Sequence, residues 1–175
     1  MAWSASLPPS AGSADAGVVV SDAGPLISLG RLDLLQLLPK VFAQVQVPTA
    51  VLEECMARPD NADARRIQAA LDHRWILACD AAPFARAGLD PGESAAIGRA
   101  LQIGAGLLAD DHAARQCAQA LGLRVIGTLG VLVLAKRAGH VGAIRPLVER
   151  LRASGQRLSH AAVAQALAAA HEAAD

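Results

Sequence analysis

The sequence is poor in aromatic residues and has no excess of charge of either sign. It contains two Phe, two Trp and no Tyr, so aliphatic side chains must fill the interior. Few aromatic platforms are available for stacking nucleic-acid bases, and an RNA-recognition sheet is not expected. Lys plus Arg and Asp plus Glu number 16 each, so no global positive charge attracts a phosphate backbone. Any affinity for nucleic acid must therefore be local.

Cysteines are few and long apolar runs are missing. Cys55, Cys79 and Cys117 are far apart and show no C-x-x-C spacing, which indicates buried thiols in a reducing compartment. The apolar run at residues 18–20 is too short to span a bilayer, and no basic start precedes an apolar leader. We therefore expect a cytoplasmic protein without a membrane segment.

The length of 175 residues, with 53% hydrophobic and 18% charged residues, is typical of one globular domain with a well-filled core. Residues 1–16 are rich in Ala, Ser, Pro and Gly and show no periodicity, which predicts a disordered tail. Residues 17–175 are then expected to form a single domain that includes the C-terminal helices.

Short apolar segments alternate with helical periodicity along this domain. Strands are expected over residues 18–20, 41–47, 75–79, 107–109 and 123–126. Helices are expected as two short pieces interrupted at Gly30, after Pro48, after Asn61, over 92–104, 111–121, 129–138 and 141–152, and from Ser159 onward. This βαβ rhythm predicts an α/β fold whose mostly parallel sheet has helices on both faces. In such folds ligands collect at the carboxyl ends of the strands.

Acidic residues follow two of these strands. Asp22 ends the first apolar run, and Asp110 and Asp111 follow the run at 107–109, so both sites face the same sheet edge. Glu93 opens a helix on the side that carries the apolar stripe, so it is expected to point inward. The sequence thus predicts several carboxylates at one edge.

Each acid alone has a structural explanation. Asp22 and Asp111 can cap the helices that follow them, and Glu93 can complement the positive end of its helix. Several carboxylates in one cleft, however, raise each other's pKa unless a cation binds. Oxygen ligands without a matching His or Cys set favour Mg²⁺ or Mn²⁺ over Zn²⁺, and such ions support phosphodiester hydrolysis. Metal-dependent phosphodiester hydrolysis is therefore the working hypothesis.

The acids also stand in an ordered set of motifs. These are a strand followed by Asp22, then Pro48-x-x-Val51-x-x-Glu54, Gly92-Glu93-Ser94-x-Ala96-Ile97 and Leu108-x-Asp110-Asp111. Over residues 17 to about 170 this order resembles PIN-domain proteins. The segments Asp22-Ala-Gly-Pro-Leu26-Ile27-x-Leu29, Ala114-Arg115 and Gly127-Thr128-Leu129-Gly130-Val131-Leu132-x-x-Ala135-Lys136 further resemble a PilT-like bacterial subfamily related to toxin–antitoxin ribonucleases.

The resemblance implies a three-layer sandwich of helices around a parallel sheet and a ribonuclease site that depends on Mg²⁺ or Mn²⁺. It also implies an RNA substrate, often an antitoxin partner, and frequently a homodimer. Its catalytic residues would be Asp22, Glu54, Glu93, Asp110 and Asp111, with Asp22, Glu93, Asp110 and Asp111 as metal ligands.

Two of these assignments leave alternatives open. The helical wheel does not choose between Glu53 and Glu54, and only the family pattern, with an apolar residue after the acid, selects Glu54. PIN domains often have a hydroxyl residue before the last acid, whereas this chain has Ala109, so both Asp110 and Asp111 stay candidates.

Three polar residues near these acids are candidates for substrate binding. Ser21 could bind backbone at the site, and Thr128 could cap the next helix or contact a phosphate. Arg115 lies four residues after Asp111 and could form an ion pair with it or reach a phosphate. His112 could act as a general acid, but a histidine in a first helical turn is usually a surface residue.

Other functions fit less well. A catalytically silent PIN-like module that binds a protein or RNA is the main alternative, favoured by the neutral net charge and by Ala109. A dehalogenase-type phosphatase needs a second Asp where Gly24 stands, and a receiver domain needs its acidic pair early in the chain. No phosphate-cradling G-x-x-x-x-G-K loop is present.

Overall fold

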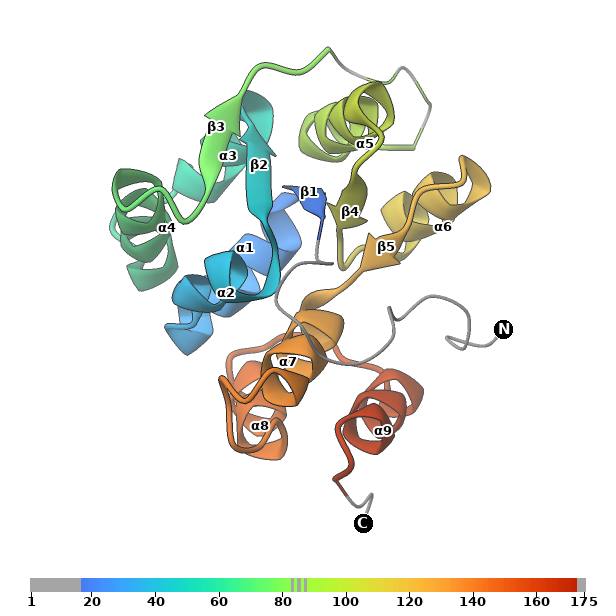
Figure 1. Ribbon diagram of the computed structural model, residues 1–175. Helices are drawn as coiled ribbons and strands as arrows, with labels where there is room; N and C mark the ends of the chain where they lie inside the picture. Colours follow the sequence, from blue (N-terminus) through green and yellow to red (C-terminus); the bar gives the residue numbers. More distant parts are fainter. Residues whose placement is uncertain (1–16, 83, 85, 87, 173–175) are drawn as a thin grey trace.

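The computed structural model describes residues 17–82, 84, 86 and 88–172, so the predicted tail at 1–16 lies outside the described residues. Within the described part, the strands form one five-stranded, fully parallel sheet in the order β3-β2-β1-β4-β5 (Figure 1). The strands are β1 (Val18–Ser21), β2 (Gln44–Pro48), β3 (Leu77–Cys79), β4 (Gly106–Leu108) and β5 (Val125–Ile126).

Helices cover both faces of the sheet. They are α1 (Ala23–Leu32), the 3₁₀ turn η1 (Leu35–Leu37), α2 (Leu38–Val41), α3 (Thr49–Met56), α4 (Ala62–Asp72), α5 (Pro91–Ile103), α6 (His112–Ala120), α7 (Thr128–Arg137), α8 (Arg145–Ala153) and α9 (His160–Ala169). Helices α5 and α6 lie on one face, and α1, α2, α4 and α7 lie on the other (Figure 1). The predicted three-layer α/β sandwich is confirmed.

The central strand β1 lies between β2 and β4 and is buried from both sides. Val19 and Val20 are 4% and 0% exposed, as a parallel sheet covered by helices requires. Ser21 is in register with Leu108 of β4, and the Asp22 N–H donates to the Leu108 carbonyl over 2.9 Å. The residues that follow β1 and β4 therefore emerge side by side at one edge of the sheet.

Helix α1 does not break at Gly30, so the predicted interruption there is wrong. A Cβ at Gly30 would lie 3.2 Å from the Asp63 Cβ of α4, which shows that this glycine permits close packing of two helices. The helix ends instead at Leu32 and is followed by the C-cap residue Asp33, whose φ of 61° lies in the left-handed region.

The boundaries of several predicted elements shift. The strand expected over 41–47 starts later than predicted. Val41 is the last residue of α2, and the buried Phe42 follows that helix before β2 starts at Gln44. The predicted helix over 141–152 begins at Arg145. Strands β3 and β5 are shorter than expected, and both are edge strands with a neighbour on one side only.

A partly buried carboxylate connects the end of the described chain to two helices. Glu172 accepts hydrogen bonds from Lys136 Nζ over 2.6 Å, from the Ile144 N–H over 2.6 Å and from the Arg145 N–H over 3.0 Å. It thereby joins the segment after α9 to α7 and to the first turn of α8. These hydrogen bonds tie the end of the described chain to α7 and α8.

The three cysteines are free thiols. Cys55 and Cys117 are buried as expected, whereas Cys79 on the edge strand β3 is only half-buried. Every helix in the described part of the chain is too short or too polar to cross a membrane.

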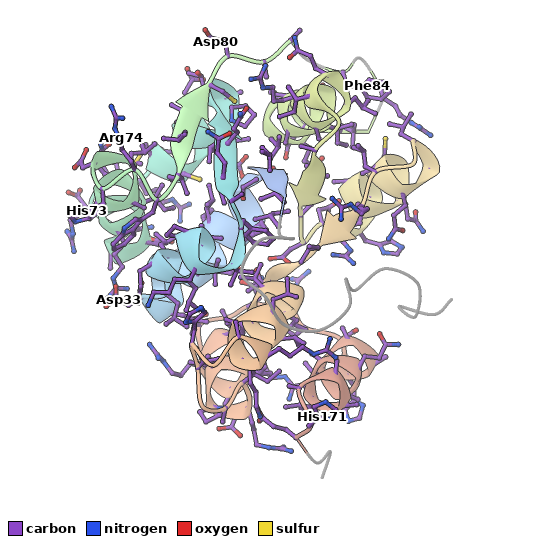
Figure 2. All side chains as sticks on the ribbon, in the orientation of Figure 1. Asp33, His73, Arg74, Asp80, Phe84 and His171 are labelled. Atoms are coloured by element: carbon purple, nitrogen blue, oxygen red, sulfur yellow. The ribbon has the colours of Figure 1, made fainter. Side chains whose placement is uncertain are left out.

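A segment between β3 and α5 runs close to the surface of α5, and Figure 2 shows Phe84 beside that helix. The Phe84 N–H donates to the Ser94 carbonyl over 3.0 Å, and Ser94 Oγ donates to the Phe84 carbonyl over 2.6 Å. One turn further along α5, a Cβ at Gly98 would lie 2.5 Å from the Ala82 carbonyl oxygen. Gly98 is therefore needed for the close approach of two backbones.

We expect Gly98→Ala to destabilise the protein by about 1–3 kcal/mol, because a backbone clash outweighs the gain in helix propensity of at most about 1 kcal/mol. Urea unfolding followed by circular dichroism measures the change. Gly30→Ala should cost less, since its Cβ would meet Asp63 at 3.2 Å rather than a carbonyl at 2.5 Å. A Gly98→Ala variant at least as stable as the wild type would contradict the close approach.

Candidate active site

Asp22 lies at the centre of the carboxyl edge of the sheet, directly after β1. Its side chain is buried, with the residue 6% exposed, and its Oδ1 atom has no hydrogen-bond partner. The side chain does not cap α1, so the capping explanation for Asp22 is wrong. A buried, unpartnered carboxylate oxygen costs free energy unless another group, such as a cation, satisfies it.

Burial raises the pKa of Asp22 from its ordinary value of 3.8 to about 7, although the backbone N–H of Ala23 partly opposes the rise. The negative charges of Asp90, Glu54 and Glu93 raise it further. Since these acids come from α3 and from the start of α5, the structure brings together carboxylates that are distant in the sequence.

Glu54 of α3 faces the N-terminus of α5. Its Oε2 atom lies 3.0 Å from the point where a Cβ at Gly92 would stand, and Asp90 Oδ1 lies 3.3 Å from the same point. Burial, followed by the charge of Asp90, raises the pKa of Glu54. Between the two adjacent glutamates, the structure places Glu54 in the cluster, which agrees with the family pattern.

Glu93 is buried at 8% exposure and takes part in a capping box at the start of α5. The Glu93 N–H donates to Asp90 Oδ1 over 2.8 Å, and the Asp90 N–H donates to Glu93 Oε2 over 3.0 Å. Burial raises the pKa of Glu93, and the charges of Asp90, Asp111 and Glu54 add to this rise. The predicted inward orientation of Glu93 is confirmed.

Asp90 is the acid that the sequence reasoning did not single out. Its charge contributes to the raised pKa of Asp22, Glu54 and Glu93. The available signal was the spacing Asp90-x-x-Glu93 before an apolar helix, which is the pattern of a capping box. That pattern predicts a helix start, and only the fold places the same carboxylate beside Glu54.

Asp111 caps α6, as predicted. Its Oδ1 atom accepts hydrogen bonds from the N–H groups of Ala113 and Ala114 over 2.7 and 3.0 Å. The residue is exposed, and its negative charge contributes to the raised pKa of Glu93 in α5. Asp111 therefore combines a structural role with a place at the edge of the cluster.

Asp110 has a different environment, because both of its oxygens are engaged by Thr128. Oδ1 accepts from the Thr128 N–H over 2.7 Å, and Oδ2 accepts from Thr128 Oγ1 over 2.6 Å. Gln156 Nε2 approaches Oδ2 at 3.5 Å, and Gln156 is itself held by Ser28. Asp110 thus caps the N-terminus of α7 from outside that helix.

The predicted substrate contacts divide into two kinds. Ser21 and Thr128 are 0% and 1% exposed, and both hydroxyls are hydrogen-bonded, Ser21 Oγ to the Asp22 carbonyl and Thr128 Oγ1 to Asp110. Neither hydroxyl faces solvent in this structure. Arg115 is half-buried, and its Nη1 atom donates to the Ala109 carbonyl over 3.0 Å.

The expected ion pair between Arg115 and Asp111 is not formed, since no charged pair within 4.0 Å links them among the described residues. A Cβ at Gly127 would lie 2.8 Å from Arg115 Nη1 and 2.9 Å from Asp110 Oδ1. The glycine therefore leaves room for a guanidinium beside the carboxyl edge. Arg115 stays a candidate for contact with a phosphate.

The donor set matches a hard divalent cation in its chemistry. All the clustered donors are carboxylate oxygens, and the unpartnered Asp22 Oδ1 is the atom that most needs a partner. In residues 17–172, leaving aside 83, 85 and 87, no three His, Cys, Asp or Glu side chains are gathered closely enough to hold a metal ion.

Comparison with known protein families identifies the family of this chain. A family model described as a PIN domain matches residues 18–172, which is most of the chain. The chain belongs to the PIN-domain family. Its fold is accordingly of the nuclease type, while the PilT-like bacterial subfamily stays a prediction. No curated protein matches this PIN domain.

Among solved structures, the PIN domain is similar to a PilT N-terminus domain protein, SSO1118, from the hyperthermophilic archaeon Sulfolobus solfataricus P2. The two share 21% sequence identity with a TM-score of 0.45. The similarity covers 82% of this chain and 98% of the archaeal chain.

The raised pKa of Asp22 predicts a specific pH dependence of stability. Because the folded state binds a proton that the unfolded state loses near pH 3.8, metal-free protein should lose stability as the pH rises through about 7. Asp22→Asn lacks this titration, so its stability relative to wild type should increase between about pH 4 and pH 8, by up to about 4 kcal/mol. Urea unfolding in EDTA at both pH values measures the difference, and a pH-independent difference would contradict the raised pKa.

The Asp110–Thr128 contact is tested by Thr128→Val, which keeps the shape of the side chain and removes its hydroxyl. We expect a loss of about 1–3 kcal/mol in unfolding free energy, because a carboxylate oxygen loses its donor. Thr128→Ser retains the hydroxyl and serves as the matched control. Equal stability of the Val and Ser variants would show that the hydroxyl contributes nothing.

Proposed function

We propose that this PIN domain is an endoribonuclease that depends on Mg²⁺ or Mn²⁺ and hydrolyses RNA phosphodiester bonds. The observation that carries the proposal is the buried Asp22 carboxylate, whose Oδ1 atom lacks a partner and which feels the charges of Asp90, Glu54 and Glu93. If the Asp22 side chain bound nothing, an uncharged residue at position 22 would make the fold more stable. The cost is explained if a cation binds there.

The residues that would hold the cation are Asp22, Glu54, Glu93 and Asp111, directly or through water. A bound Mg²⁺ or Mn²⁺ supplies an activated water and stabilises charge that develops on the phosphate. Asp110 would serve as a positioning residue, since Thr128 engages both of its oxygens. Arg115 would contact a phosphate of the substrate.

The remaining parts of the proposal rest on the resemblance of the motifs. They are a cytoplasmic toxin, an antitoxin protein as its partner, and a homodimer. Because the net charge is neutral, we expect RNA to bind at a local site or together with a partner protein, and not along a broad basic surface. A small overlapping gene that encodes a DNA-binding protein next to this one would support the toxin assignment.

One observation favours a second candidate, a catalytically silent PIN-like module that binds a protein or RNA. Asp90, Glu93 and Asp111 each accept a backbone N–H at a helix start, and no three acidic side chains of the described residues are gathered closely enough to hold a metal ion. A module of this kind would capture its partner without cutting RNA.

Cleavage of a labelled RNA mixture by the full chain in 5 mM Mn²⁺ or Mg²⁺ distinguishes these functions. We expect cleavage that EDTA abolishes and that falls about 100-fold or more in Asp22→Asn and Glu93→Gln, because each loses a charged ligand. Asp72→Asn and Glu53→Gln are matched controls outside the cluster and should cut like the wild type.

Cleavage that persists in Asp22→Asn would contradict the proposed site. Stable capture of RNA or of the neighbouring gene product, with no cleavage in either metal, would instead favour the silent module.

A further inference from the structure

Positive charge is unevenly distributed along this PIN domain, although the total charge is balanced. Residues 112–172 contain eight Lys and Arg against two acidic residues, Glu149 and Glu172, whereas residues 17–111 contain eight against twelve. The basic stretch includes α7, α8 and α9, which lie together at the bottom of Figure 1. The balanced total therefore conceals a basic C-terminal part.

Exposed arginines at the end of α8 carry positive charge without a counter-ion. Arg150 and Arg152 lie in the last turn of this helix, and Arg157 follows in the segment before α9. All three are exposed, and none pairs with a carboxylate within 4.0 Å among the residues that the structure describes. Arg150 Nη2 donates to the Leu32 carbonyl over 3.2 Å, whereas the side chains of Arg152 and Arg157 make no hydrogen bond within the described ranges.

The helix dipole explains only part of this pattern. A cation in the last turn of a helix is stabilised by the negative end of the dipole, and Arg150 and Arg152 satisfy this condition. The effect is confined to the last turn, and Arg157 lies beyond the last helical residue, Ala153. The charge of Arg157 therefore needs another explanation.

The segment that carries Arg157 lies beside the carboxyl edge of the sheet. Its neighbour Gln156 accepts a hydrogen bond from Ser28 Oγ over 2.8 Å, and Gln156 Nε2 approaches Asp110 Oδ2 at 3.5 Å. Since Asp110 directly follows β4, the chain after α8 returns to the candidate active site.

Arg115 of α6 brings a second guanidinium to the same place. Its Nη1 atom donates over 3.0 Å to the carbonyl of Ala109, the residue before Asp110. A Cβ at Gly127 would lie 2.8 Å from Arg115 Nη1 and 2.9 Å from Asp110 Oδ1, so these two groups border the same small space. Arginine-bearing segments from α6 and from the end of α8 therefore meet at Asp110.

We propose that the end of α8 and the segment after it bind the phosphate backbone of RNA, with Arg152 and Arg157 as the contacts. Guanidinium groups suit phosphates because they can donate two parallel hydrogen bonds. Residues 112–172 contain no Phe, Trp or Tyr, so this surface reads phosphates and offers no stacking for bases. The inference rests on the proposed function in taking RNA as the substrate, and it requires neither a bound metal nor cleavage.

Arg152→Gln/Arg157→Gln removes both charges and is the test variant. The probe is a fluorescein-labelled single-stranded RNA of mixed sequence, and fluorescence anisotropy in EDTA measures its binding to the full chain without metal-dependent cleavage. We expect binding at about 50 mM salt to weaken about 10-fold, because two phosphate contacts are lost. The slope of log K against log salt should become shallower by about 0.7 for each lost contact.

Arg65→Gln/Arg74→Gln is the matched control, since it removes the same charge from exposed positions on α4 and just after it, where Figure 2 shows Arg74. Its RNA affinity should stay within about twofold of the wild type. Arg152→Lys/Arg157→Lys keeps both charges and should keep the salt dependence of the wild type. Arg157→Gln alone, outside the helix, should lose one contact and serves as the test if the double variant fails to fold.

Equal RNA binding by the test variant and its matched control would overturn the inference, and so would a wild type that binds no RNA in EDTA. Poly-glutamate is a second probe for the same samples. Loss of poly-glutamate binding with unchanged RNA binding would also overturn the inference and assign the arginines to an acidic protein partner.

RNA cleavage by the same samples in Mn²⁺ keeps the two proposals separate. A wild type that binds RNA through Arg152 and Arg157 but does not cut it refutes only the nuclease. Cleavage by the wild type, together with unchanged RNA binding in the test variant, refutes only the role of these arginines.

Discussion

Electrostatic repulsion at the carboxyl edge of the central strand is the constraint on which the site depends. β1 ends at the middle of the sheet, so the residue after it is enclosed by helices on both sides (Figure 1). The chain places Asp22 there, with an unpartnered oxygen and acidic neighbours from α3 and α5. Such an arrangement lowers the stability of the fold, and the proposed cation would offset that cost.

Helix N-termini act as substitutes for positive side chains around this edge. Glu93, Asp110 and Asp111 each accept a backbone N–H at or near the start of α5, α7 or α6. These donors stabilise negative charge without a lysine or arginine, which fits a chain with no excess of positive charge. Asp22 receives no such side-chain cap. Backbone donors therefore stabilise Glu93, Asp110 and Asp111, whereas the Oδ1 atom of Asp22 has no hydrogen-bond partner.

The C-terminal helices support the site from a distance. Gln156, in the segment between α8 and α9, bridges Ser28 of α1 and Asp110 after β4. Glu172 joins the end of α9 to α7, whose first residue, Thr128, engages Asp110. A chain of hydrogen bonds thus runs from the C-terminal part of the domain to the acid that positions α7.

The sequence by itself determined the parallel α/β fold, the placement of Asp22 and the Asp110-Asp111 pair at one edge, and the inward side of Glu93. These follow from local periodicity and from the rule that parallel strands share a carboxyl edge. Only the tertiary structure decided that Glu54 faces the cluster, that Asp110 is bound to Thr128, and that the cap residue Asp90 lies beside Glu54. Those facts depend on how α3, α5 and α7 pack against one another, and a contact between helices distant in the chain leaves no periodic signal in the sequence.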